Sequence, residues 1–340
     1  MTPMGSKTGQ GENIGVIGAG AFGTALATIA AQSGRAAVIY GRDPARIAEI
    51  NEHRTNARYL PDVRLPDAIS ASTDPGALAP CDIILVAVPA QATRKVTRAL
   101  ANTLRRGVYI LACAKGIERE TGASQVAILS ETLPQRPLAV LSGPGFAADI
   151  AKALPTAVTI AADALETARY VADRLATPSF RPYASTDVTG VELGGALKNV
   201  IAIACGIAEG CKFGESARAA LTARGFAEIT RLGLALGAKR ETMAGLSGLG
   251  DLILTCNSMQ SRNMSLGAAL GEGQSLKDIM ASRNTVAEGV PTSGAVVQLA
   301  RSKSIEMPIA EAVNSIVTEE KTVSRAILDL LARPFTSEGT

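Results

Sequence analysis

Apolar runs and helical periodicities alternate along the first half of the chain. Continuous apolar runs predict buried strands, and segments with apolar residues three and four apart predict amphipathic helices between them. The predicted strands lie within residues 13–20, 36–41, 81–89, 108–116, 138–144 and 156–162. The predicted helices lie within residues 21–34, 43–53, 92–104 and 164–176. Strand and helix in series predict right-handed crossovers and a doubly wound α/β sheet of the Rossmann type.

The pattern changes near Asp187, beyond which no clear strand pattern remains. The later periodic segments predict helices within residues 191–210, 215–237, 263–273, 275–281, 289–303, 307–320 and 322–332. We therefore expect a dinucleotide-binding Rossmann domain over residues 13–187 and an all-helical substrate domain over residues 188–333. The remaining segments are expected to be a flexible N-terminal tail over residues 1–12 and a loose C-terminal tail over residues 334–340.

The amino-acid composition and net charge limit the classes of function that we expect for this chain. The 340 residues suit two domains, and 47% hydrophobic residues supply a large core. Aromatic residues make up only 3%, and the net charge of +3 comes without a basic cluster, which disfavours nucleic acid and leaves room for an anionic small molecule. The N-terminus lacks a secretory signal, and no apolar run is expected to span a membrane.

The cysteine and histidine content excludes some kinds of metal site and catalytic group. Five cysteines, Cys81, Cys113, Cys205, Cys211 and Cys256, form no C-x-x-C pattern, so we expect free thiols in a reducing cytosol. His53 is the sole histidine, which excludes a histidine-based metal site and a conventional Ser-His triad, and no metal is expected.

Gly18, Gly20 and Gly23 form a G-x-G-x-x-G pattern that follows the first predicted strand and opens the first predicted helix. The first glycine makes the tight turn, the second lets backbone N–H groups approach a pyrophosphate, and the third packs helix on strand. The positive end of the helix then faces the phosphates. In this context the pattern predicts dinucleotide binding, and the alternative is an ordinary tight turn.

The end of the second predicted strand bears on the choice of cofactor. Sites selective for NAD usually place an acid there for the ribose 2′-hydroxyl, but this chain has Tyr40-Gly41-Arg42. Because an arginine can pair with a 2′-phosphate, NADPH is favoured over NADH. Two alternatives stay open: Asp43 is the ribose acid rather than only a helix N-cap, or Arg42 is a solvated loop charge.

Lys198 stands in GVELGGALKNVIAIACG, where nearly every neighbour is apolar or small. Gly194 and Gly195 lie one helical turn earlier on the same face, so a ligand or another backbone can approach the ammonium group. Partial desolvation would lower the lysine pKa toward the range of a general acid or base, which indicates proton transfer. The alternative is a lysine that reaches solvent, or a structural ion pair with Glu192 or Glu209.

Other candidates stand at strand ends and turns. Lys115 ends a buried strand, where open α/β sheets bind ligands, and SGPGFAAD (residues 142–149) is a second Gly-rich turn whose N–H groups can face an anion. Gln260-Ser261-Arg262-Asn263 precedes a helical pattern and offers an arginine to a phosphate. Each has a plain alternative: a surface lysine, a simple turn or a capping turn. Asp251 has a turn residue as its alternative, and Glu288 a solvated charge.

Together these segments resemble the bacterial-type NAD(P)-dependent glycerol-3-phosphate dehydrogenases over roughly residues 13–330. The segments in the family's order are IGAGAFGTALA, YGRDP, NARYLPDV, ACAKGIE, SGPGFA, ELGGALKNVIAIA, GLGDLILTC, QSRN and VAEG. The resemblance implies a 6-phosphogluconate-dehydrogenase-like fold and reversible hydride transfer between NAD(P)H and dihydroxyacetone phosphate. The product, sn-glycerol 3-phosphate, would supply phospholipid synthesis in the cytoplasm, and the apolar C-terminal helices favour a homodimer.

The resemblance also implies roles for individual residues. Lys198 resembles the proton donor to the developing alkoxide, Lys115 a lysine that contacts substrate and cofactor, and Asp251 an aspartate near the substrate hydroxyls. The other implied substrate-binding residues are Gly143, Gly145, Ser261, Arg262 and Asn263. The implied cofactor-binding residues are Gly18, Gly20, Ala21, Phe22, Gly23, Arg42, Tyr59, Lys115, Ala147, Arg262, Val286 and Glu288.

Two positions depart from the family pattern. The family usually has Ser where this chain has Ala21, and Thr or Ser where it has Gly145. Each change removes a hydroxyl group near a phosphate or the substrate, although backbone N–H groups can still serve. One neutral hydrogen bond contributes about 0.5–1.5 kcal/mol, so we expect weaker binding rather than a lost reaction.

Two rival functions stay open at this point. A β-hydroxyacid or ketopantoate-type reductase shares the two-domain plan, but its carboxylate substrate needs a different anion site where QSRN lies. A non-catalytic NADPH sensor or scaffold would bind the cofactor and have no use for Lys198 as a proton donor.

Overall fold

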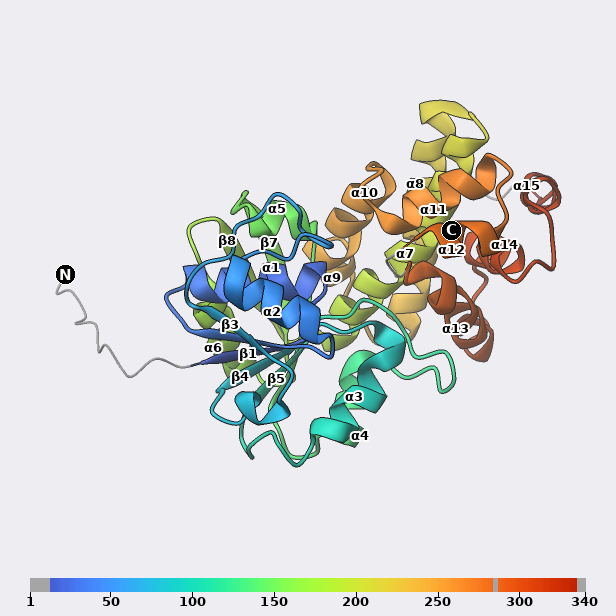
Figure 1. Cartoon of the computed structure of the whole chain (residues 1–340). Helices are drawn as coiled ribbons and strands as arrows, with labels where there is room; N and C mark the ends of the chain where they lie inside the picture. The colour runs from blue at the N-terminus through green and yellow to red at the C-terminus, as the bar shows by residue number, and fades with distance from the viewer. Residues whose placement is uncertain (1–12, 284–286, 335–340) are drawn as a thin grey trace.

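The computed structural model describes residues 13–283 and 287–334 of the chain. Figure 1 shows two lobes, a first lobe that contains a β-sheet and a second lobe built from helices. This arrangement confirms the predicted fold class, a Rossmann-type sheet domain followed by an all-helical region.

An eight-stranded sheet forms the centre of the first lobe, in the order β3-β2-β1-β4-β5-β6-β7-β8. Neighbouring strands from β3 to β6 are parallel, β7 is antiparallel to β6, and β8 is parallel to β7. The strands are β1 (Ile14–Ile17), β2 (Ala37–Tyr40), β3 (Ile69–Ser72), β4 (Ile83–Val86), β5 (Tyr109–Ala112), β6 (Leu138–Ser142), β7 (Thr156–Ala161) and β8 (Phe180–Ser185). The reversal at β7 and the strands β3 and β8 were not predicted.

Helices cover both faces of the sheet. The helices of the first lobe are α1 (Ala21–Gln32), α2 (Pro44–His53), α3 (Thr93–Leu100), α4 (Gln125–Thr132), α5 (Ala147–Ala151) and α6 (Leu165–Leu175). One apolar cluster joins α1, α2, α5 and α6 to one face, and another joins α3 and α4 to the opposite face (Figure 1). Two-sided burial explains why the central strands read as continuous apolar runs.

The second lobe is built around one long helix, α7 (Val188–Gly210). The other helices are α8 (Gly214–Ala235), α9 (Arg240–Met243), α10 (Asp251–Cys256), α11 (Arg262–Gly271), α12 (Leu276–Ser282), α13 (Gly289–Ser302), α14 (Pro308–Val317) and α15 (Val323–Leu331). A π-helical turn, η3 (Leu246–Gly250), precedes α10. Short helices α4, α9 and α10 were not predicted, whereas α5 follows the Gly-rich turn within residues 142–149.

Glycines let α7 and α11 lie in backbone contact. A Cβ atom placed on Gly206 would lie 2.0 Å from the Met264 carbonyl oxygen, and one placed on Gly267 would lie 2.1 Å from the Ile203 carbonyl oxygen. No side chain fits there, so a larger residue at either position would force the helices apart. This close packing fixes the start of α11 relative to the middle of α7, where Lys198 stands.

The expectation that no apolar run is long enough to cross a membrane was wrong. Helix α7 has 23 residues and a mean hydropathy of 1.5, which satisfies the length and composition of a membrane-spanning helix. In the structure 89% of its apolar window is buried against other parts of the chain. The helix is apolar on all sides because it is the core of its lobe.

Asp187 makes the junction between the lobes. Its carboxylate accepts hydrogen bonds from the backbone N–H groups of Gly190 (2.9 Å) and Lys239 (2.8 Å). The first contact caps the start of α7, which begins three residues before the predicted helix at Val191. The second ties the same carboxylate to the segment before α9.

Candidate active site

The glycine-rich turn between β1 and α1 has the geometry of a phosphate cradle. Gly18 has a φ of +119°, and a Cβ atom there would lie 2.8 Å from the Ala87 carbonyl oxygen, while one on Gly23 would lie 2.0 Å from the Gly18 carbonyl oxygen. Gly20 differs, because a Cβ atom on it would meet nothing within 4 Å. No side chain caps α1, whose first turn holds Ala21 and Phe22, so the helix start is open to an anion.

Asn56, from the NARYLPDV segment, supports this turn and was not singled out from the sequence. Its side chain is fully buried and donates hydrogen bonds to the Ala19 carbonyl oxygen (3.0 Å) and to the Thr24 hydroxyl (2.8 Å). The same amide accepts a 3.1 Å hydrogen bond from Arg46. Because the buried Asn56 amide forms hydrogen bonds through both its nitrogen and its oxygen, it fixes the glycine-rich turn against the loop after α2.

The end of β2 lies directly beside the glycine-rich turn. The Gly18 N–H group donates to the Tyr40 carbonyl oxygen at 2.9 Å, and Arg42 follows as an exposed side chain. Asp43 is occupied as the N-cap of α2, where it accepts from the N–H groups of Ala45 (3.1 Å) and Arg46 (3.4 Å). Its predicted capping role is therefore confirmed.

Two lysines and one aspartate meet where the two lobes join. The Lys198 Nζ atom lies 2.5 Å from Asp251 Oδ1 and 2.7 Å from the Thr255 hydroxyl, and the Lys115 Nζ atom lies 2.7 Å from Asp251 Oδ2. Lys198 is 7% exposed and Asp251 is 1% exposed. Two ammonium groups and one carboxylate leave a net positive charge in a site sheltered from water.

Burial lowers the pKa of Lys198 to about 8, because water no longer stabilises its charged form. The Asp251 carboxylate opposes this shift and the positive charge of Lys115 adds to it. The predicted desolvation is therefore present, although the partner was not predicted. Glu192 instead accepts a hydrogen bond from the Val126 N–H group, and Glu209 pairs with Arg218.

The π-helical turn η3 positions Asp251 under the lysines. A Cβ atom on Gly248 would lie 1.9 Å from the Met243 carbonyl oxygen, and one on Gly194 of α7 would lie 2.5 Å from the Ser247 carbonyl oxygen. Gly248 thus lets this turn pack against the end of α9, and Gly194 lets it lie directly on α7. Helix α10 then begins at Asp251, with Thr255 one turn later on the same face.

Lys115 connects the lysine cluster to the glycine-rich turn after β1 and to the turn after β6. Its Nζ atom donates a 2.8 Å hydrogen bond to the Gly143 carbonyl oxygen and lies 5.9 Å from the centre of the Phe22 ring. Gly143 needs its glycine, because its φ is +145° and a Cβ atom there would lie 2.8 Å from the Val158 Cα atom. The structure therefore brings Lys115, Gly143 and Phe22 together.

Hydrogen bonds through two asparagine side chains link α7, α11 and the start of α13 next to the lysines. Asn199 donates to the Lys115 carbonyl oxygen (3.0 Å) and accepts from Asn263 (2.9 Å), whose own carbonyl accepts from the Gly289 N–H group (2.9 Å). Asn263 therefore lies close to the cluster, with its side chain fully engaged within the protein. Asn199 and Thr255 were missed as site residues, because their partners lie far away in the sequence.

The start of α11 presents Arg262 and backbone N–H groups. The Ser261 hydroxyl accepts from the Met264 N–H group at 3.2 Å, so this predicted ligand residue serves as an N-cap. Burial raises the pKa of Glu288, and the hydrogen bond from the Ala90 N–H group and the charge of Arg262 oppose this rise. Glu288 Oε1 accepts a 3.0 Å hydrogen bond from the Ala90 N–H group of the first lobe.

The remaining predicted residues lie farther from the lysines or carry no polar contact to them. Tyr59 packs under Arg46, whose guanidinium lies 5.0 Å from its ring centre, on the α2 side of the turn. Ala21 and Ala147 pack against the same apolar cluster of the first lobe, and Gly145 lies in the β6–α5 turn. Val286 lies outside the described residues.

All five cysteines are free thiols, four of them buried and Cys211 half-buried. Within residues 13–283 and 287–334, no group of three or more His, Cys, Asp or Glu side chains is arranged to hold a metal ion.

The fold and the site define the class of protein: a two-domain oxidoreductase that uses a nicotinamide dinucleotide. The model of the NAD-dependent glycerol-3-phosphate dehydrogenase N-terminus matches residues 13–168, and that of the C-terminus of the same family matches residues 187–328. The chain belongs to the NAD-dependent glycerol-3-phosphate dehydrogenase family.

Similar proteins agree with this assignment over almost the whole length. Glycerol-3-phosphate dehydrogenase (NAD(P)+) from Parvibaculum lavamentivorans is 53% identical over 325 residues, which cover 96% of this chain and 98% of the relative. The enzyme of that name from Maricaulis maris is 53% identical over 327 residues, with the same coverage. A crystal structure of glycerol-3-phosphate dehydrogenase from Coxiella burnetii superposes with a TM-score of 0.91 at 37% identity, covering 95% of this chain and 99% of that one.

Proposed function

We propose that this chain catalyses the reversible NAD(P)H-dependent reduction of dihydroxyacetone phosphate to sn-glycerol 3-phosphate, and so supplies glycerol phosphate for phospholipid synthesis. Membership of the family supports the reaction. The observation that carries it is the cluster of Lys198, Lys115 and Asp251, which lies beside an open glycine-rich cradle and joins the two lobes. In this proposal residues 13–187 bind the dinucleotide and residues 188–333 complete the substrate site.

When bound, the nicotinamide supplies the hydride that reduces the substrate carbonyl. Negative charge develops on the carbonyl oxygen, and the ammonium group of Lys198 stabilises that charge and then protonates the oxygen. A pKa of about 8 suits this role, because the amine is protonated at neutral pH and still gives up its proton readily. In the reverse reaction neutral Lys198 accepts the proton from the substrate hydroxyl.

Asp251 and Lys115 prepare the site for this transfer. Asp251 holds both ammonium groups through its two oxygens, so each lysine has a fixed direction before substrate arrives. Lys115 contributes the second positive charge and contacts substrate and cofactor. The net positive charge of the cluster stabilises the developing alkoxide more than the neutral carbonyl. This difference in stabilisation lowers the activation barrier of the reduction.

The substrate phosphate binds at the start of α11. Arg262 supplies a guanidinium group suited to bidentate contact, and the N–H groups of Arg262 and Asn263 point out of an unpaired first turn. Ser261 and Asn263 hold this turn in place with their side chains, through the N-cap and the Asn199 contact. Gly143 and Gly145 contribute backbone groups from the opposite side.

Backbone N–H groups must replace the hydroxyl group that the family has at the position of Gly145. A Cβ atom there would lie 2.9 Å from the Ile150 Cδ1 atom and 3.1 Å from the Thr156 Cγ2 atom. A serine or threonine would therefore need both neighbours to move.

The glycine-rich turn and Arg42 are the groups that would hold the dinucleotide. Gly18, Gly20 and Gly23, with the N–H groups of Ala21 and Phe22, receive the pyrophosphate. Arg42 favours NADPH over NADH because it is exposed beside the turn while Asp43 is occupied as a helix cap. The further cofactor residues in this proposal are Tyr59, Lys115, Ala147, Arg262, Val286 and Glu288.

The enzyme is proposed to be a cytoplasmic homodimer. Five free thiols suit a reducing compartment. Leu328 and Leu331 on α15 are 60% and 78% exposed, which supports an apolar contact between copies through the C-terminal helices.

A spectrophotometric assay tests the proposed reaction and its closest rival together. Purified protein should oxidise NADPH in the presence of dihydroxyacetone phosphate, and turn over hydroxypyruvate and ketopantoate at least about a hundredfold more slowly in kcat/KM, because Arg262 and the start of α11 suit a phosphate. The reverse preference would show that the chain is a hydroxyacid or ketopantoate-type reductase.

A further inference from the structure

A groove on the outside of the Lys115 loop takes no part in the proposed reaction. It has a volume of about 720 Å³ and lies between α3, the loop after β5 and the first turn of α13. The lining residues that matter here are Gln91, Arg94, Lys95, Arg98, Arg119 and Pro291. The volume lies within the range of small-molecule sites.

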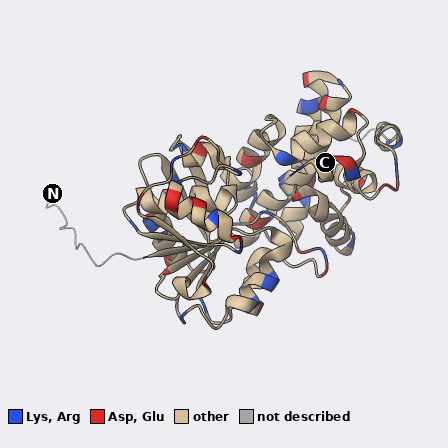
Figure 2. Cartoon of the chain, viewed as in Figure 1, with Lys and Arg blue, Asp and Glu red and all other residues tan. Residues whose placement is uncertain are grey.

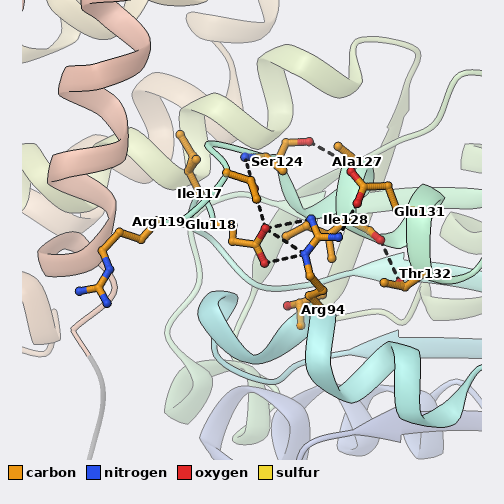
Figure 3. A network of polar contacts seen from close by, with 12 residues as sticks. Arg94, Ile117, Glu118, Arg119, Ser124, Ala127, Ile128, Glu131 and Thr132 are labelled. Atoms are coloured by element: carbon orange, nitrogen blue, oxygen red, sulfur yellow. Dashed lines mark hydrogen bonds and ion pairs between the residues drawn. The ribbon is translucent and has the colours of Figure 1, made fainter.

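An ion-pair network builds one wall of the groove. Arg94 forms a two-pronged contact with Glu118, Nε to Oε1 and Nη2 to Oε2, both at 2.9 Å, and also pairs with Glu131 (Figure 3). Glu118 is 6% exposed and accepts a further hydrogen bond from the Thr121 hydroxyl at 2.6 Å. The charge of Arg94 is therefore balanced within the protein, and its role is to hold α3 against the loop.

Gln91 fixes the rim of the groove at the other side. Its amide donates to the Ile117 carbonyl oxygen at 2.8 Å and accepts from the Arg119 N–H group at 2.9 Å. This pair of contacts ties the turn before α3 to the loop that carries Arg119. The groove is therefore held open by side-chain contacts rather than formed by loosely packed surface.

Positive charge in the groove is left unbalanced. Lys95, Arg98 and Arg119 form no ion pair within the described part of the chain, and Glu120 is the one further carboxylate of the lining once Glu118 is paired with Arg94. In Figure 3 the Arg119 side chain points away from the network. Figure 2 shows basic residues along the outer side of α3. Three cations against one carboxylate leave an excess of two positive charges in the lining itself, and Glu131, which shares Arg94 with Glu118 beside the groove, reduces this excess to one.

We propose that this groove binds a small polyanion that carries two or more phosphate groups and no aromatic base. Three lining cations, Lys95, Arg98 and Arg119, are available for charge-assisted contacts, which suits a ligand that carries several phosphate oxygens. A concave site favours a small molecule over a flat anionic surface. The lining contains no aromatic side chain on which a base could stack.

A ligand bound in the groove would affect the active site through two short segments of the chain. Glu118 and Arg119 follow Lys115 closely in the chain, and Pro291 stands in the first turn after Glu288. A polyanion held between Arg119 and α3 would restrain the loop that carries Lys115. We therefore expect it to change KM for substrate or cofactor more than kcat.

Calorimetric titration of the full-length protein with inorganic tripolyphosphate tests the proposal. We expect one site per chain whose affinity falls with rising salt and survives saturating NADPH. Removal of one cation by Arg119→Ala, or of two by Lys95→Ala with Arg98→Ala, should weaken binding by about tenfold or more, because each contributes a charge-assisted contact. Arg301→Ala, an exposed arginine on α13 outside the groove, should bind as the unaltered protein does.

Three results would overturn the proposal. The first is the absence of tripolyphosphate binding. The second is binding that the groove variants leave unchanged. The third is binding that NADPH displaces or that Arg262→Ala abolishes, because the probe would then occupy the cofactor or substrate site. Melting temperatures and circular dichroism of each variant identify any loss of folding, and the exposed positions of Arg98 and Arg119 make such loss avoidable.

Discussion

At the scale of single residues, the charged side chains of Lys198 and Arg42 differ in their surroundings. Lys198 is buried with a carboxylate and a hydroxyl partner, whereas Arg42 is exposed and Asp43 is used as a cap. The paired lysine has a perturbed pKa and suits proton transfer. The free arginine suits recognition of a phosphate.

The pH dependence of the reduction should reflect Lys198. The donor must be protonated, so kcat/KM for reduction of dihydroxyacetone phosphate should fall as pH rises through about 8, and kcat/KM for the oxidation of glycerol 3-phosphate should rise over the same range. In Asp251→Asn the group that raises the lysine pKa is lost, so the fall should begin at lower pH, with kcat reduced about tenfold or more. Stopped-flow or steady-state rates from pH 6 to 10 measure both effects.

Asp163→Asn is the matched control for this prediction, because Asp163 is exposed in the loop before α6. Its pH profile should coincide with that of the unaltered protein. An Asp251→Asn enzyme with an unshifted profile would mean that another group sets the pH dependence.

Arg42 should decide the choice between the two cofactors. Arg42→Ala removes a charge-assisted contact to the 2′-phosphate, so KM for NADPH should rise roughly 10- to 100-fold while KM for NADH changes little. Initial rates with each cofactor, compared with those of the exposed-loop variant Arg64→Ala, make the measurement. Equal losses with both cofactors would show that Arg42 does not contact the 2′-phosphate.

At the scale of elements, buried side chains that cap distant helices hold the second lobe together. Helix α14 has no side-chain cap of its own. Glu228 of α8 supplies one from a distance, since its carboxylate accepts from the N–H groups of Ile309 (2.8 Å) and Ala310 (3.3 Å). This contact fixes α14 against α8, and the sequence gives no local sign of it.

Burial raises the pKa of Glu228 to about 7, although the two N–H contacts oppose the shift. Because this folded-state pKa lies above the unfolded value, the folded protein binds more protons between about pH 4.5 and 7, and stability falls as pH rises through that window. The contribution is at most about 3 kcal/mol. Denaturant unfolding at pH 5 and pH 8 should therefore show a smaller pH difference for Glu228→Gln than for the unaltered protein.

Two further variants complete this experiment. Glu228→Ala removes the cap at every pH and should lower the free energy of unfolding by about 1–2 kcal/mol even at pH 5. Glu320→Gln, an exposed acid near the end of α14, should match the unaltered protein. An unchanged pH difference in Glu228→Gln would contradict the assignment of the raised pKa.

Sequence periodicity predicted the six inner strands of the sheet but missed the two strands at its edges. The six predicted strands are apolar runs that the sheet buries, whereas β3 and β8 are the two edge strands. Strand β3 reads ISAS and β8 contains Arg181 and Pro182, so neither has the pattern of a buried strand. Proline is tolerated at a sheet edge, where no neighbour needs its missing N–H group.

At the scale of the whole molecule, the active site exists only where the two lobes meet. Lys115 comes from the loop after β5, Lys198 from α7 and Asp251 from the start of α10. Lys115 and Lys198 were predicted as candidates from their local patterns and from the family resemblance, and Asp251 from the resemblance. Their convergence on one carboxylate, and the support from Asn199, Thr255 and Asn56, depends on contacts between distant segments that no local pattern reveals.

The central claim is that Lys198 transfers the proton, and one comparison tests it most directly. Turnover of dihydroxyacetone phosphate and the affinity for NADPH, followed by cofactor fluorescence, are measured for Lys198→Ala and for Lys277→Ala, an exposed lysine of α12 in the same lobe. We predict that Lys198→Ala loses turnover by roughly 10²- to 10⁴-fold while the Kd for NADPH stays within about twofold, and that Lys277→Ala changes neither. A Lys198→Ala protein with unimpaired turnover would contradict the account and point to a site that needs no amine.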